Sequence, residues 1–358
     1  MTAADQTLRH LVAWGLPGGP EEPLDLDGVQ GLTRLSAWHR VTGVVLEALA
    51  DGAATGIGDD LIESLEEQHR RILHQSLAAE ADLVWVTDRY REAGIEFRVL
   101  KGCATAHLDH DDPALRTTSD VDLLVRHHDF RRASDLLAAV NDRQAPPPDL
   151  RPDWNDRYAR ERAVKIVDGA WIDIHQTLVA GYWGMSIDHD ALFEDPSDFE
   201  VAGRRLLGLG ANDRFAHAVI HAGFSSVVRI QSFRDVAVLA ARHDVSPVDI
   251  LNDARWRPIS GLLGRGIERT ATLLPMAPEL IEWAGSVRPR RRESMAFRTL
   301  KGGDGGSYYR SGPLALPPWQ WPRYLYPIVI PSQEYLDWHG RSRIDHFGRA
   351  LPRWRRRP

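Results

Sequence analysis

The chain has 358 residues, 43% of them hydrophobic and 26% charged, and a net charge of −6 at pH 7. This size and composition predict a substantial core and about two or three compact units. The negative charge argues against a uniformly basic nucleic-acid binder. The single cysteine, Cys103, excludes an intrachain disulfide and a zinc cluster built from cysteines.

Neither a membrane span nor a secretory signal is indicated. Apolar runs stay well below the ~20 residues that cross a bilayer. The N-terminus lacks the basic segment followed by an apolar one that marks a signal peptide. We therefore expect a cytoplasmic protein without a membrane partner.

The chain divides into four predicted regions. Residues 1–93 are predicted to be helical, residues 94–205 to form a small α/β core, residues 206–288 to be helical again, and residues 289–358 to form an arm rich in Pro, Trp and Arg. The predicted fold class is therefore α+β or α/β, with a small mixed sheet flanked by N-terminal and C-terminal helical regions.

The longest predicted helix spans residues 61–94. Apolar residues recur there at three-to-four spacing, and Gly94 is a suitable C-cap. The aliphatic residues predicted to line its buried side are Leu61, Leu65, Ile72, Leu73, Leu77, Leu83, Val84 and Val86.

The most informative stretch is residues 97–125, FRVLKGCATAHLDHDDPALRTTSDVDLLV. A short strand, a glycine turn and a polar loop are predicted to lead into a second strand that carries Asp120 and Asp122. Residues i and i+2 of a strand point to the same face, so these carboxylates project side by side. Such a pair repels unless a cation lies between its members. Because Mg²⁺ takes oxygen ligands of this kind together with substrate phosphates, the pattern indicates metal-assisted phosphoryl or nucleotidyl transfer.

A later pair of strands supplies a third carboxylate. Residues 163–178 have the pattern of a hairpin that turns at Asp168-Gly169. The second strand places Asp173 and His175 on one face. Two metal ions that hold attacking and leaving oxygens need about three carboxylates, and Asp173 is the best third candidate. For His175 two interpretations stay open, a group that orients a ligand or takes a proton, and a buried, hydrogen-bonded histidine.

Four residues around the aspartates are candidates for nucleotide binding. Lys101 or Arg116 could neutralise a triphosphate, arginine being suited to bidentate contact. Gly102 would let the backbone approach a phosphate closely. Ser119 directly precedes the first aspartate.

Each of these signals also has a purely structural interpretation. A lone Asp-x-Asp in a strand is common on a solvated surface, and Lys-Gly often ends a strand. The joint pattern is more specific, because it combines Leu-Lys-Gly after a strand, an arginine, Ser-Asp-Val-Asp on a strand and Asp-Ile-His on a later strand.

Several histidines and acidic residues admit a second interpretation as metal ligands. His217 and His221 have the i, i+4 spacing of a zinc-peptidase helix, but Ala218 stands where the general base is needed, so packed histidines are favoured. A polar cluster before Arg116 is predicted to be a loop, some of which could touch substrate or metal: His107, Asp109, His110, Asp111 and Asp112.

The C-terminal region combines basic and aromatic clusters. Its arginines are predicted to be solvated, or to attract an acidic acceptor: Arg290, Arg291, Arg292, Arg353, Arg355, Arg356 and Arg357. Its aromatic run is predicted to pack across the core as an extended arm, or to line an acceptor pocket in part: Trp319, Trp321, Tyr324 and Tyr326.

The pattern of residues 100–125 resembles a known group of proteins. Leu-Lys-Gly at 100–102, Arg116 and Ser-Asp-Val-Asp-Leu-Leu-Val at 119–125, followed by a helix, resemble the uncharacterised nucleotidyltransferase family of the polymerase-β-type superfamily. Residues 171–178, 215–224 and 234–240 resemble later segments of that family.

The resemblance implies a mixed sheet with packed helices and a site for an NTP with Mg²⁺ or Mn²⁺ at the carboxylate strands. By position, Asp120 and Asp122 match the paired metal ligands, and Asp173 matches the third carboxylate. One departure concerns Gly102-Cys103, which lies further upstream than the superfamily's Gly-Ser and has cysteine in place of serine. Residues 107–118 are therefore expected to form a longer loop.

These observations predict an enzyme that moves a nucleoside monophosphate from an NTP to an acceptor and releases pyrophosphate. A small molecule or a peptide is favoured over nucleic acid as the acceptor. The alternative is a non-catalytic protein that keeps the nucleotide fold as a partner-binding module. All three carboxylate positions are filled, which favours catalysis. A hydrolase built on His217 and His221 lacks a base.

Overall fold

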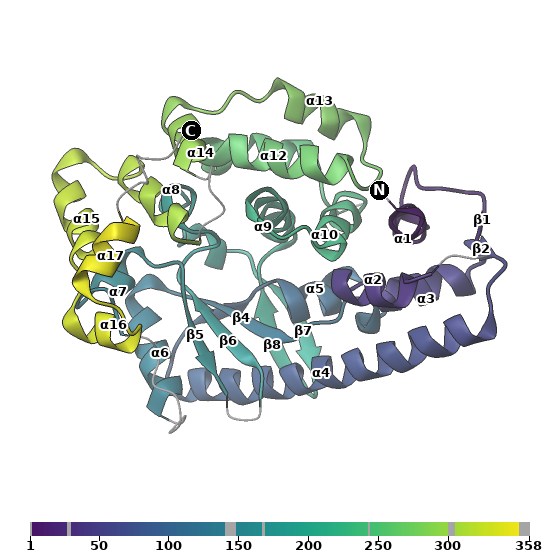
Figure 1. The fold of residues 1–358 in the computed structure, drawn as a ribbon, viewed down its shortest axis with the longest axis horizontal. Coiled ribbons are helices and arrows are strands. Elements are labelled where there is room, and N and C mark those ends of the chain that lie inside the picture. The colour runs from purple at the N-terminus through teal and green to yellow at the C-terminus, as the bar shows by residue number, and fades with distance from the viewer. Residues whose placement is uncertain are drawn as a thin grey trace.

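The computed structural model describes residues 2–26, 30–139, 148–166, 169–242, 244–299 and 305–350. Helices enclose one six-stranded mixed sheet, with a long helix along one side of it and a group of helices on the other (Figure 1). The predicted fold class is confirmed. Within the described residues, none of the helices combines the length and the apolar character needed to span a bilayer.

The sheet has the strand order β5-β6-β4-β3-β8-β7. The central strands β3 (Phe97–Val99) and β4 (Asp120–Val125) are antiparallel to each other. On one side, β4 pairs in parallel with β6 (Trp171–His175), which forms an antiparallel hairpin with β5 (Glu161–Lys165). This hairpin confirms the prediction for residues 163–178, whereas Asp168 at its expected turn lies outside the described residues.

On the other side, β3 pairs in parallel with β8 (Arg204–Gly208), the partner of β7 (Ser197–Val201). This second hairpin was not predicted. It turns at Ala202-Gly203, where both residues have positive φ, 47° and 73°. Short strands with a mixed polar and apolar pattern give too weak a periodicity to stand out in the sequence.

Alternate residues of β4 enter two different hydrophobic clusters. Val121, Leu123 and Val125 pack with the C-terminal half of the long helix α4 (Asp59–Glu92) and with α6 (Phe130–Ala139). On the opposite face Leu124 joins the helices that follow the sheet. The sheet is therefore buried on both faces, and Asp120 and Asp122 share the face of Leu124.

The N-terminal region is helical as predicted, with α1 (Ala3–Ala13), α2 (Leu32–His39), α3 (Thr42–Ala50) and α4. A two-residue parallel pair, β1 (Leu24–Asp25) and β2 (Ala54–Thr55), joins them. Gly94 follows the end of α4 with φ 67°, the left-handed conformation expected after a C-cap.

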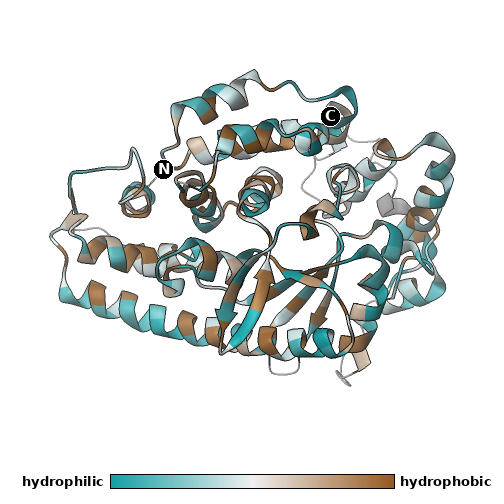
Figure 2. Cartoon of the chain, turned by 180° about the vertical axis from the view of Figure 1, so that it is seen from behind, coloured by the Kyte–Doolittle hydropathy of each residue, from teal (hydrophilic) through white to brown (hydrophobic). Residues whose placement is uncertain are grey.

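The buried stripe of α4 is shifted from the predicted one. The prediction that Leu77 is buried is wrong, because this residue is 60% exposed. The stripe instead passes through the small residues Ser76 and Ala79 before it reaches Leu83. Figure 2 shows the resulting alternation of hydrophilic and hydrophobic residues along this helix. Hydrophobicity alone missed the small residues that allow close packing of a helix on a sheet.

The predicted loop after β3 is partly helical. Residues Lys101–Asp109 form α5, with non-helical geometry at Gly102. The small buried residues Cys103, Ala104 and Ala106 pack this helix against its neighbours, so His107 and Asp109 lie on a helix and not in a loop. Only the stretch from His110 to Ser119 remains irregular apart from one short 3-10 turn, η1 (Pro113–Leu115).

Residues 206–288 are helical after β8, as predicted. The helices are α9 (Ala211–Phe224), α10 (Ile230–Ala240), α11 (Pro247–Asn252), α12 (Ser260–Ala271) and α13 (Pro278–Ser286), with η4 (Ala254–Ile259) before α12. Between β5 and β8 lie α8 (Gly181–Gly184) and η3 (Ala191–Phe193), and α7 (Trp154–Tyr158) precedes β5. A single-turn η2 (His127–Asp129) precedes α6.

The C-terminal region is helical and not an extended arm. It contains α14 (Arg291–Thr299), η5 (Gly305–Leu314), η6 (Pro318–Gln320), α15 (Trp321–Val329), α16 (Gln333–Trp338) and α17 (Arg343–Ala350). Pro322 is tolerated because it stands in the first turn of α15, whereas Pro327 lies inside this short helix. Tyr324 is buried against Trp154 and Tyr158, whereas Trp319 is 78% exposed. The terminal arginines from Arg353 onward lie outside the described residues.

Candidate active site

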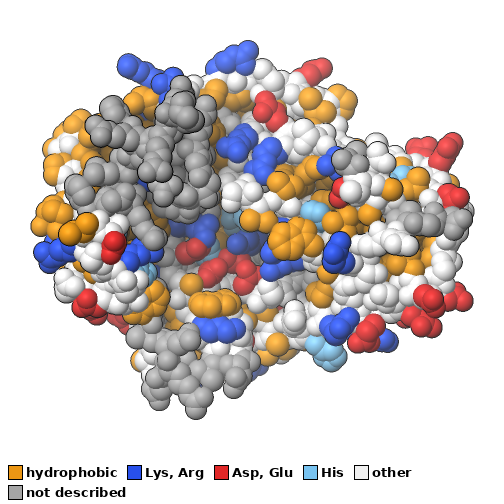
Figure 3. Space-filling view, viewed as in Figure 1, with side chains coloured by type: hydrophobic (Ala, Val, Ile, Leu, Met, Phe, Trp, Pro, Cys, Tyr) orange, Lys and Arg blue, Asp and Glu red, His pale blue; other side chains and the backbone are white. Residues whose placement is uncertain are grey.

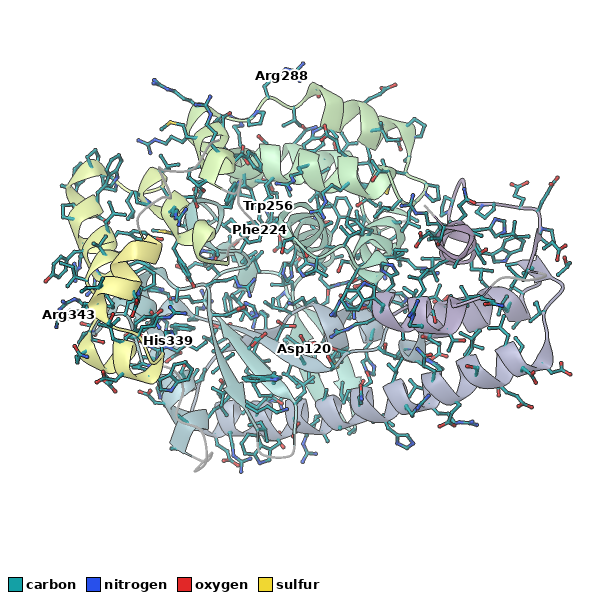
Figure 4. The ribbon with its side chains drawn as sticks, in the orientation of Figure 1. Asp120, Phe224, Trp256, Arg288, His339 and Arg343 are labelled. Carbon is teal, nitrogen blue, oxygen red and sulfur yellow. The ribbon has the colours of Figure 1, made fainter. Side chains whose placement is uncertain are left out.

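The register between β4 and β6 brings two predicted carboxylates together. Asp122 is paired directly with Asp173 in the parallel ladder, so both side chains leave the same face of the sheet. Ligand atoms of Asp122, Asp173 and His175 all lie within 4.8 Å of one another. Figure 4 places Asp120 near the centre of the molecule, and Figure 3 shows acidic and basic side chains gathered in a hollow of this face.

Asp122 is the buried centre of the group. Its Oδ1 accepts hydrogen bonds from Lys101 Nζ (2.9 Å) and His175 Nε2 (2.8 Å). Burial alone would raise the pKa of Asp122, but the Lys101 ammonium and the His175 bond together hold this pKa well below its usual range. Burial likewise disfavours the charge of Lys101, yet the attraction of Asp122 raises the pKa of the ammonium. Both bonds fall on Oδ1, so neither of them occupies Oδ2.

Asp173 has the opposite environment. Burial raises its pKa to about 6, and the negative charges of Asp122 and Glu161 act in the same direction. Two carboxylates that face each other in this way are an oxygen donor set suited to a hard divalent cation, whose charge would remove the repulsion. The residues present therefore fit Mg²⁺ or Mn²⁺.

Asp120 lies at the outer edge of the same face. Its side chain is 35% exposed, Thr118 Oγ1 lies 3.3 Å from its Oδ1, and Arg40 Nη1 lies 3.8 Å from the same oxygen. Arg40 Nη2 also donates to Ser119 Oγ at 2.9 Å. The structure thus places Ser119 beside an arginine of the N-terminal helices, which sequence reasoning had not connected with the site.

His175 is held between two acids. Its Nε2 bonds to Asp122, while its Nδ1 lies 3.4 Å from Glu161 Oε2, a close approach in which neither atom has a hydrogen bond within the described residues. Glu161 begins β5, directly opposite His175 in the antiparallel ladder. Sequence reasoning missed Glu161, because only the pairing register of β5 and β6 places it opposite His175. The ring contacts Asp122, so both interpretations of His175 remain compatible with its position.

Residues 27–275 match the sequence model of a protein family described as uncharacterised nucleotidyltransferase. The chain belongs to this family. The matched segment is more than half of the 358 residues and contains all the carboxylates above, and it ends before α13. No curated protein is significantly similar to the chain. Among solved structures, similarity is found to the crystal structure of an antigenic nucleotidyltransferase-like protein from Paracoccidioides brasiliensis, with a TM-score of 0.34, 13% identity, and coverage of 61% of this chain and 96% of that chain.

In this member of the nucleotidyltransferase family, the turn from β3 to α5 brings Lys101 into contact with Asp122. Gly102 has φ 45° and ψ −109°, and a Cβ there would lie 2.8 Å from Thr118 Oγ1. Glycine is required both by this left-handed backbone and by the close approach to Thr118. A role of Lys101 and Gly102 in phosphate binding stays a prediction.

Arg116 is engaged within the protein. Only 7% of its surface is exposed, and its Nε and Nη2 donate to the carboxylate oxygens of Asp235 at 2.9 Å each. This bidentate pair fixes the segment before β4 to α10. Arg116 and Lys101 both line a small internal cavity of about 20 Å³ with His217 and His221. The predicted contact of Arg116 with a triphosphate stays untested.

His217 and His221 lie on α9 behind Lys101. Burial lowers the pKa of both, and the charge of Lys101 adds to this effect, bringing the pKa of His221 to about 3. Neither histidine belongs to a group of three potential metal ligands within the described residues. Such an environment favours neutral, packed imidazoles, in line with the preferred interpretation of the sequence.

Proposed function

We propose that the protein transfers a nucleoside monophosphate from an NTP to an acceptor, with Asp120, Asp122 and Asp173 as the carboxylates that hold a divalent metal. The observation that carries this proposal is the direct pairing of Asp122 with Asp173 on neighbouring parallel strands. Membership of the nucleotidyltransferase family supports the general reaction.

The proposed reaction is an in-line displacement. An acceptor oxygen attacks the α-phosphorus, the bond from that phosphorus to the bridging oxygen breaks, and pyrophosphate leaves with the bonding electrons. The acceptor proton passes to a base or to solvent. We favour a small molecule or a peptide as acceptor. Mg²⁺ or Mn²⁺, when bound, would supply positive charge to the phosphate oxygens.

The surrounding residues would keep the carboxylates in place. Lys101 and His175 hold Oδ1 of Asp122, and neither of them bonds to Oδ2. Glu161 lies against the far side of the His175 ring and limits its rotation. These positions leave Asp120, at the exposed edge, closest to solvent and to an entering substrate.

The test is calorimetric titration of each of the four NTPs with and without Mg²⁺, on the wild type and Asp173→Asn. Asp198→Asn is a matched control, because Asp198 is an exposed residue of the edge strand β7, where it pairs with Arg205. We expect metal-dependent binding in the wild type and the control and its loss in Asp173→Asn. Undiminished metal-dependent binding by Asp173→Asn would contradict the assignment of this carboxylate, and a wild type that binds no NTP would contradict the proposed function.

A further inference from the structure

A polar cavity of about 350 Å³ opens beside the aspartate strand, between the N-terminal helices and the segment that precedes β4. Helices α2 and α4 contribute most of its wall, and residues 117–119 form the side nearest to Asp120. The polar lining residues include Arg40, Gln68, Arg71, Gln75, Thr118 and Ser119. Guanidinium, amide and hydroxyl groups of this kind are the donors that bind phosphate oxygens.

Arg40 is held in an unusual conformation at the edge of this cavity. It follows the last residue of α2 with φ 57° and ψ 38°, a left-handed geometry that glycine adopts without strain and arginine does not. A left-handed residue commonly ends a helix, and the backbone N–H of Arg40 bonds accordingly to the carbonyl groups of Ser36 and Ala37. The side chain is 31% exposed and reaches Ser119 Oγ and the neighbourhood of Asp120.

The charge of Arg40 is only partly compensated within the described residues. Its nearest carboxylate oxygen, on Asp120, lies 3.8 Å away, beyond hydrogen-bond distance. Burial lowers the pKa of Arg40, and the positive charge of Arg229 adds to this effect. An anion bound in the cavity would stabilise the charged form of Arg40 against both its burial and the repulsion by Arg229.

A second observation comes from Gln68, on the α4 wall. Its amide Nε2 is buried and has no hydrogen-bond partner within the described residues. Buried donors are almost always paired in folded proteins. Because this nitrogen is enclosed by the protein, it would reach a ligand in the cavity only after the terminal amide turns about its last torsion. Gln68 of α4 and Arg40, which follows α2, both line this cavity.

We propose that this cavity binds the phosphate groups of the donor NTP, with Arg40 as the anchoring cation and Gln68 as a second donor. The inference rests on the proposed function, because it places the triphosphate next to Asp120. Arg71, whose side chain is 69% exposed at the rim and 3.8 Å from Glu67, would contribute less because solvent screens it. The N-terminal helices would thus supply part of the nucleotide site and not only cover the sheet.

Arg40→Gly is the decisive variant, because glycine fits the left-handed backbone at this position and the fold should be retained. We expect its dissociation constants for pyrophosphate and for a non-hydrolysable NTP analogue to rise about 10- to 100-fold, the loss typical of a charge-assisted hydrogen bond. Arg40→Lys should recover part of the affinity, since it restores the charge but not the planar fork. Arg70→Gln, an exposed α4 residue paired with Glu67, should leave affinity unchanged.

Two further readouts separate this proposal from its alternatives. Mn²⁺ alone should bind Arg40→Gly at least as tightly as the wild type, because the variant removes a positive charge near Asp120 and no metal ligand. Unchanged affinity of Arg40→Gly for both phosphate probes would overturn the proposal. A wild type that binds pyrophosphate but no NTP would overturn the proposed function and leave the cavity as a phosphate site. Binding of neither probe would overturn both.

Discussion

Asp122 and Asp173 are neighbours in the sheet, yet their surroundings favour opposite charge states. Lys101 and His175 stabilise the ionised form of Asp122, whereas burial and two nearby acids favour the protonated form of Asp173. A residue's role in this site is therefore set by which partners the fold places against it. The sequence contains the same residue type at both positions.

Neutralising Asp173 should stabilise the metal-free protein. The folded-state pKa of about 6 exceeds the ordinary value of 3.8, so ionised Asp173 lowers the free energy of unfolding, and stability falls as pH rises from about 4 to 6. We expect Asp173→Asn to raise the free energy of unfolding at pH 7 by about 1 to 2 kcal/mol, allowing for partial exposure. Urea unfolding in EDTA at pH 7 and at pH 3.5 checks this, since the gain should vanish at the lower pH.

Gly102 combines a left-handed backbone with a close contact, and the two effects can be separated. Gly102→Ala should lower the free energy of unfolding by about 2 to 4 kcal/mol, because Cβ strain adds to the clash with Thr118 Oγ1. Gly203→Ala is the matched control, since Gly203 has φ 73° with nothing within 4 Å of an added Cβ. Equal losses for the two variants in urea unfolding would show that the contact with Thr118 has no energetic effect.

At the scale of elements, buried charges fix helices to one another. Asp109 at the end of α5 accepts three hydrogen bonds from Arg214 of α9, the shortest 2.7 Å. The Arg116–Asp235 pair likewise joins the segment before β4 to α10. The polar stretch from His107 to Arg116 has the composition of a loop. These two ion pairs nevertheless hold it against α9 and α10. The partners of Asp109 and Arg116 are over 100 residues away, so no local pattern reveals them.

Glu293 of α14 caps a different helix and should be essential for its packing. Its fully buried carboxylate accepts from the backbone N–H groups of Gly261 (3.0 Å) and Leu262 (2.8 Å) at the start of α12, and from Trp183 Nε1 (3.2 Å). In Glu293→Gln one oxygen becomes an amide donor that faces an N–H group. We expect the free energy of unfolding to fall by about 2 to 3 kcal/mol, measured by urea denaturation. The exposed Glu282→Gln on α13 should change it by less than about 0.5 kcal/mol.

At the scale of the whole molecule, the predicted regions share their cores. One hydrophobic cluster joins Leu8 and Val44 of the N-terminal helices with Phe215 of α9 and with Leu100 and Leu124 next to the aspartates. A second cluster joins the C-terminal half of α4 to the sheet. We propose that residues 1–93, 94–205 and 206–288 fold as one cooperative unit.

This shared core predicts that the sheet region does not fold by itself. A fragment of residues 94–205 lacks Leu83, Val86 and Tyr90, which are fully buried against the strands. We expect the fragment to show no cooperative thermal transition by circular dichroism, whereas the full chain unfolds in one main step. Extending the fragment to residues 59–205 restores α4 but still exposes the face of Leu124, so it should remain far less stable. A cooperative transition for residues 94–205 alone would contradict the shared core.

Local patterns were enough to predict the helical regions, the β5–β6 hairpin and the carboxylate strands, because periodicity, turn residues and the Asp-x-Asp spacing belong to single segments of the chain. Which charged groups meet one another depends on the packing of distant segments. The tertiary structure set Asp122 opposite Asp173, placed Glu161 behind His175, engaged Arg116 with Asp235 and brought Arg40 to Ser119. Each of these contacts arises from strand register or from helix packing between distant segments. A local sequence pattern contains no information about either of them.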